Sequence, residues 1–165
     1  MVTEPINLRE WKAPGSSWQR GRLFTCGRPG RGTYGRAKVT VAEHIIDRWA
    51  GGLPKADVLY IVSLLGRKTT GLSEFSYYPF RSSEEHDAKP TLQEWLTKRY
   101  GQRFIVHEVP TVDGRGIPRG ILDAAARSVR NSLERGHTTV VIDSAGAERS
   151  GRVCEAIGYK LGIES

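Results

Sequence analysis

The residues best suited to chemistry lie in one short segment, Val140–Gly151, which reads VVIDSAGAERSG. An apolar run enters it, four small residues follow Asp143, and a helix is expected to begin near Arg149. Small side chains let successive backbone N–H groups point into one concavity, where a helix N-terminus and an arginine favour a phosphate oxyanion. A plain strand-to-helix turn is the alternative. The residues expected to contact the anion are Ser144, Ala145, Gly146, Ala147, Glu148, Arg149 and Ser150.

This segment resembles the signature loop of the cysteine-dependent protein tyrosine and dual-specificity phosphatases, which reads His-Cys, five residues, Arg, Ser or Thr, Gly. Ser144–Glu148 supply the five residues, and Arg149–Gly151 complete the pattern. Asp143 stands at the position of the nucleophilic cysteine, and Ile142 at that of the histidine. In an active member the arginine would clamp the transition state.

The resemblance extends upstream of the loop. The family's general acid is an aspartate before a Gly-x-Pro-like stretch and a long helix, and Asp113 in Val112–Pro118 matches that order. Asp113 would then protonate the leaving oxygen, although Asp-Gly is also a common turn. The resemblance implies a single phosphatase-like α/β domain over residues 20–165, with a central, mainly parallel sheet, after an irregular lead-in over residues 1–19.

An aspartate at position 143 changes the expected chemistry. Its carboxylate is a poorer nucleophile toward phosphorus than a thiolate and adds negative charge to the site. We therefore expect a catalytically inactive pseudophosphatase that binds a phosphoryl group through Arg149 and the loop backbone. Because Ile142 also departs from the family pattern, natural loss of the catalytic cysteine is favoured over its engineered replacement in an active phosphatase. Direct aspartyl-phosphate catalysis is a third interpretation, and it usually needs a metal.

Composition restricts the partners. The 165 residues carry a formal net charge of +7, with 25 Lys and Arg against 18 Asp and Glu, which favours an anionic partner. A phosphorylated protein or another phosphate-bearing ligand is expected, and a nucleic acid or an RNA 5′ phosphate is the alternative. No apolar run is long enough for a membrane span. Two cysteines indicate a reducing, cytoplasmic setting, and no metal site or cofactor is expected.

Other segments have weaker functional interpretations. The Gly-rich basic segment 27–36, with Tyr34 among its arginines, is expected to select substrates, to contact nucleic acid or to be plain surface. The aromatic segment 75–80 predicts an edge strand, with stacking on a ligand ring as the alternative. Cys154 is expected to pack in the core, and His107 and His137 are expected to be structural.

Alternating strand and helix patterns position these residues. The sequence predicts strands at 22–26, 58–65, 104–109 and 138–142, and helices at 40–50, 91–100, 117–135 and 149–161. This alternation indicates a parallel sheet with helices on both faces. Because ligands bind beyond the carboxyl ends of parallel strands, the loop after Val62 and the loops at 110–118 and 143–150 are expected to meet.

Overall fold

The computed structural model describes residues 3–12, 18–37, 39–67, 74, 80–112 and 114–158. In these residues one five-stranded sheet has the strand order β1-β2-β5-β3-β4. The first pair is antiparallel and the other neighbours are parallel, which confirms the predicted α/β class with a mainly parallel sheet. The strands are β1 (Arg9–Trp11), β2 (Leu23–Gly27), β3 (Leu59–Ser63), β4 (Phe104–Glu108) and β5 (Thr138–Asp143).

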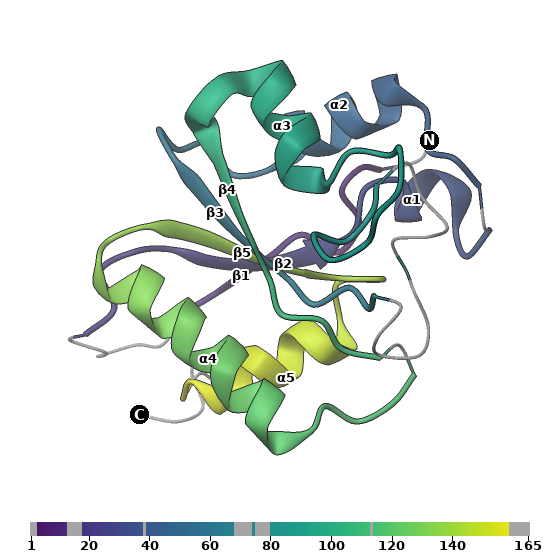
Figure 1. Ribbon diagram of the computed structural model, residues 1–165. Helices are drawn as coiled ribbons and strands as arrows, with labels where there is room; N and C mark the ends of the chain where they lie inside the picture. The colour runs from purple at the N-terminus through teal and green to yellow at the C-terminus, as the bar shows by residue number, and fades with distance from the viewer. Residues whose placement is uncertain are drawn as a thin grey trace.

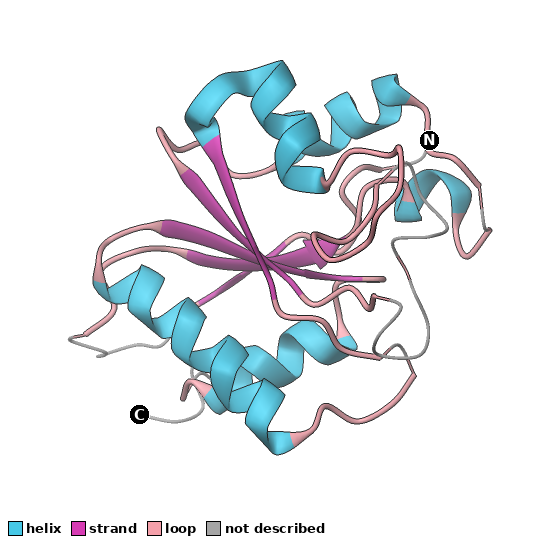
Figure 2. Ribbon diagram, viewed as in Figure 1, coloured by secondary structure: helices cyan, strands magenta, loops and turns pink. Residues whose placement is uncertain are grey.

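Helices cover both faces of the sheet. Figures 1 and 2 show two helices on one face, α2 (Glu43–Gly52) and α3 (Leu92–Tyr100), and two on the other, α4 (Arg119–Glu134) and α5 (Glu148–Ala156). A single turn, α1 (Arg31–Tyr34), lies beside the carboxyl ends of the strands. Within the described ranges, no helix combines the length and apolar composition needed to cross a bilayer.

The core forms two layers because the central strands are covered on both sides. Every residue of β2 is buried, and β5 is buried except at its first residue, as expected for parallel strands between helices. Trp49 of α2 and Leu96 of α3 fill one layer. Val129 of α4 and Val153 of α5 fill the other.

Local signals place most helix ends within a few residues of the prediction. Thr91 and Glu94 form a capping box that starts α3, since each side chain accepts the other residue's backbone N–H. Gly136, at φ 84°, follows α4 in the left-handed conformation that favours glycine. The predicted stop of α2 after Ala50 is wrong by two residues, because Gly51 and Gly52 form its last turn.

The predicted irregular lead-in over residues 1–19 is wrong for Arg9–Trp11, which form strand β1. The strand forms because Trp11 buries its ring and donates its Nε1–H to Thr25 Oγ1 at 2.9 Å. Glu4 is also buried, and its carboxylate accepts the backbone N–H groups of Gly30 and Thr33. Three residues are too few for a periodicity to appear in the sequence. The domain boundary near residue 20 stays a prediction.

Candidate functional site

The three predicted loops meet at the carboxyl ends of the parallel strands. The Arg149 Nη1 donates to the Leu64 carbonyl oxygen at 3.2 Å and to the Thr111 Oγ1 at 2.9 Å. Thr111 also donates its hydroxyl to the Leu64 carbonyl at 2.6 Å. Leu64 follows β3, Thr111 follows β4 and Arg149 follows β5, so the expected juxtaposition of these loops is confirmed.

The 143–150 loop bends around the carboxylate of Asp143. That side chain is 2% exposed, and it accepts the backbone N–H of Gly146 on one oxygen and that of Ser150 at 2.9 Å on the other. Two backbone dipoles therefore converge on a negative charge at the base of the loop, next to the start of α5. Two N–H groups of the loop thus face a carboxylate of the loop itself, and binding of a phosphate oxyanion by residues 144–150 stays a prediction.

Gly146 is required by the close approach of the loop to β2. Its φ is 78°, and a Cβ atom there would lie 2.2 Å from the backbone carbon of Cys26 and 2.2 Å from the backbone nitrogen of Gly27. The loop is also held from outside, since Asn7 Nδ2 donates to the Ala145 carbonyl oxygen at 2.7 Å and the Arg28 N–H donates to that of Ser144 at 3.2 Å.

The side chain of Arg149 is turned toward a buried carboxylate. Its two terminal nitrogens donate to the two oxygens of Glu74 at 2.7 and 2.9 Å, and only 4% of the residue is exposed. Glu74 also accepts the backbone N–H of Gly66 at 2.8 Å, which ties it to the loop after β3. The sequence prediction missed Glu74, because 75 residues separate it from Arg149 and no motif marks it.

Several donors of the loop have no acceptor among the described residues. In the part of the chain that the structure describes, the backbone N–H groups of Ala145, Ala147 and Glu148 have no hydrogen-bond acceptor. The hydroxyl oxygen of Ser150 is buried and likewise has no partner there. An oxyanion above the loop could therefore accept hydrogen bonds from the N–H groups that Asp143 does not use.

The structure describes the other predicted site residues less completely. Asp113 lies outside the described residues, so its assignment as the general acid stays a prediction. The neighbouring backbone forms a turn in which the Arg115 N–H donates to the Val112 carbonyl oxygen at 3.3 Å. Arg115 and Arg119 are exposed. Ile142, at the position of the family's histidine, is fully buried in the core against the α2 and α3 face.

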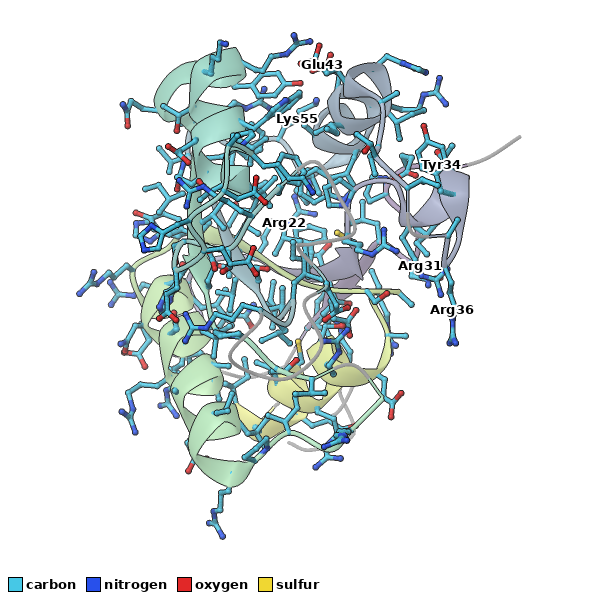
Figure 3. All side chains as sticks on the ribbon, turned by 45° about the vertical axis from the view of Figure 1, so that its right-hand side comes forward. Arg22, Arg31, Tyr34, Arg36, Glu43 and Lys55 are labelled. Atoms are coloured by element: carbon cyan, nitrogen blue, oxygen red, sulfur yellow. The ribbon has the colours of Figure 1, made fainter. Side chains whose placement is uncertain are left out.

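The basic segment 27–36 is more ordered than its glycine content suggests. It contains helix α1, at the rim of the molecule where Figure 3 labels Arg31, Tyr34 and Arg36. Arg36 is exposed, whereas Tyr34 is partly buried and packs against the core on the α2 and α3 face. Arg28 is an exception, because it is 2% exposed and its Nη2 donates to the Gly35 carbonyl oxygen at 3.2 Å. Not every arginine of the segment is thus available to an anionic partner.

The cysteines and histidines do not join the site. Cys26 and Cys154 are fully buried, which confirms the predicted core packing of Cys154. Burial raises the pKa of both thiols. His107 pairs with Ser128 at 2.7 Å, and His137 stacks on Tyr60 with a centroid separation of 4.1 Å. Among the described residues, no three His, Cys, Asp or Glu side chains are grouped as a metal site. Of the aromatic segment 75–80, only Phe80 is described, and it is buried.

Comparisons of the chain with protein-family models, with curated proteins and with solved structures find no match.

Proposed function

We propose that the chain is a phosphatase-like domain without phosphatase activity, whose 143–150 loop binds a phosphoryl group of a partner. The observation that carries the proposal is the convergence of the Gly146 and Ser150 N–H groups on the carboxylate of Asp143. A loop that stabilises one buried anion has its backbone dipoles oriented for anions. The N–H groups of Ala145, Ala147 and Glu148 supply further donors for an external oxyanion.

Asp143 accounts for the absence of hydrolysis in this proposal. Each of its oxygens already accepts a backbone hydrogen bond, which lowers its reactivity as a nucleophile. The same negative charge weakens phosphate binding, since two unit charges about 4 Å apart repel by roughly 4 kcal/mol at an effective dielectric constant near 20. We therefore expect affinity for inorganic phosphate in the millimolar range, limited by Asp143 itself.

Phosphate titration followed by amide chemical shifts tests this proposal. Inorganic phosphate should shift the amides of residues 144–150, and Asp143→Asn should bind it at least ~10-fold more tightly because one repulsive charge is removed. Asp57→Asn is the matched control, since Asp57 is exposed before β3 at the opposite end of the sheet. If 10 mM phosphate leaves these amides unshifted in both the wild type and Asp143→Asn, the proposal is wrong.

A cysteine at position 143 tests how much of a catalytic site remains. Arg149 is already held by Glu74 and Thr111, and a thiolate at 143 would lie where the loop N–H groups converge. We expect Asp143→Cys to hydrolyse an aryl phosphate, while the wild type and Asp143→Ser do not. Hydrolysis by the wild type would overturn the proposal. Inactivity of all three proteins would instead support a purely binding role.

A further inference from the structure

A cavity of about 240 Å³ lies against the outer side of the 143–150 loop. It is separate from the Arg149 side, since Arg149 points toward the loops after β3 and β4. Strand β1 runs antiparallel to β2, so its first residues lie at the same end of the sheet as the loop. The residues that line the cavity include Asn7, Leu8, Arg9, Trp11, Gly146 and Ala147.

The walls of this cavity are held in place. The Asn7 side chain donates to the Ala145 carbonyl oxygen at 2.7 Å, which fixes the N-terminal segment to the loop. Trp11, which also lines the cavity, is 4% exposed and donates its indole N–H to Thr25. Any group bound in the cavity would therefore keep a defined position relative to the loop.

Among the described residues, the lining offers one cation and no carboxylate. Arg9 is exposed, its guanidinium carbon lies 4.5 Å from the centroid of the Trp11 ring, and it forms no ion pair within the described ranges. Glu10 projects from the other side of β1 and pairs with Arg22 at 2.8 Å. Leu8 adds an apolar surface that is 40% exposed. A carboxylate on a short aliphatic stem fits this combination.

We propose that the cavity is a subsite for an acidic side chain of the partner polypeptide, next to the phosphorylated residue bound by the 143–150 loop. The inference rests on the proposed function. Gly146 and Ala147 line the cavity and belong to the loop, so the two bound side chains lie within about two residues of each other at 3.3–3.6 Å per extended residue. A single cation beside an apolar side chain favours a peptide over a nucleic acid, which needs several phosphate contacts.

Two synthetic phosphotyrosyl peptides provide the probe. Both have alanine at the outer positions, and the two residues on either side of the phosphotyrosine are all glutamate in one peptide and all glutamine in the other. Dissociation constants are measured for the full chain, for Arg9→Gln and for Arg20→Gln. Arg20 is the matched control, since it is exposed and precedes β2 at the opposite end of the sheet. Inorganic phosphate and a 5′-phosphorylated RNA oligonucleotide are titrated in parallel.

The wild type should bind the glutamate peptide about fivefold more tightly than the glutamine peptide, and Arg9→Gln should remove this preference. Arg20→Gln should retain it, and phosphate affinity should stay within twofold in both variants. Equal effects of the two variants, or no preference in the wild type, overturn this inference alone. If the oligonucleotide binds more tightly than either peptide and both variants weaken it, the partner is a nucleic acid and the inference is wrong. If neither peptide nor phosphate binds, the proposed function fails as well.

Discussion

Glu74 neutralises Arg149 through two parallel hydrogen bonds, and both side chains are less than a tenth exposed. The pair joins the start of α5 to the segment that follows β3. Because Glu74 also accepts the Gly66 N–H, its carboxylate orients the guanidinium from a fixed backbone position. Arg149 is thereby held in a defined position beside the loop, and Glu74 offsets part of its positive charge.

Removing Glu74 should destabilise the fold more than breaking a surface ion pair does. Glu74→Gln leaves Arg149 buried without its counter-charge, so we expect the free energy of unfolding to fall by about 3 kcal/mol. Glu10→Gln breaks the more exposed pair with Arg22 and should cost much less. Urea unfolding of the two variants measures both values. Equal costs would mean that the buried pair has no special structural role.

Substitution of Gly146 should test the contact between the loop and β2. Gly146→Ala places a Cβ against the backbone of Cys26 and Gly27, so we expect a loss of stability above about 3 kcal/mol. Gly101→Ala is the control, because Gly101 also has a positive φ, of 68°, but open space around its Cα. Its expected cost is about 1 kcal/mol. Similar urea midpoints for the two variants would contradict the close approach.

Gln93 should protect the outer edge of β4. Its side chain imitates a neighbouring strand, since Nε2 donates to the Phe104 carbonyl oxygen at 2.8 Å and Oε1 accepts the Val106 N–H at 2.6 Å. Gln93→Ala exposes both backbone groups, so we expect a loss of about 1–2 kcal/mol and concentration-dependent association through the free edge. Sedimentation velocity and urea unfolding measure the two effects. Gln102→Ala, at an exposed glutamine, is the control and should leave the protein unchanged.

Tyr100 should make the free energy of unfolding fall at alkaline pH. Burial and the hydrogen bond to Asp47 raise the pKa of Tyr100 from its usual 10 to about 12. Because the folded-state pKa is the higher one, the phenol's contribution, about 1 kcal/mol, is complete below pH 10 and is lost as the pH rises through about 12. The difference in unfolding free energy between the wild type and Tyr100→Phe measures it. A difference that stays constant to pH 12 would contradict the raised pKa.

The elements of the sheet could be predicted because their patterns are long. The β-branched run at 138–142 and the apolar run at 58–65 are typical of parallel strands buried on both faces, and both form strands with slightly different ends. Strand β1 could not be predicted in the same way. Its three residues are ordered by the burial of Trp11 and by pairing with β2, which are interactions distant in sequence.

The features of the candidate site also divide into those set by local sequence and those set by contacts between distant segments. The spacing of Asp143, the small residues and Arg149 is local, and a loop that must turn from a strand into a helix determines where their backbone groups point. The sequence by itself therefore determined the α/β class and the turn of the 143–150 loop from a strand into a helix, and it predicts that the loop binds an anion. Only the tertiary structure decided that Asp143 accepts the loop's own N–H groups, that Glu74 pairs with Arg149, and that Arg9 borders the loop. These contacts depend on which segments the folded sheet brings together, and no local pattern of residue types encodes that choice.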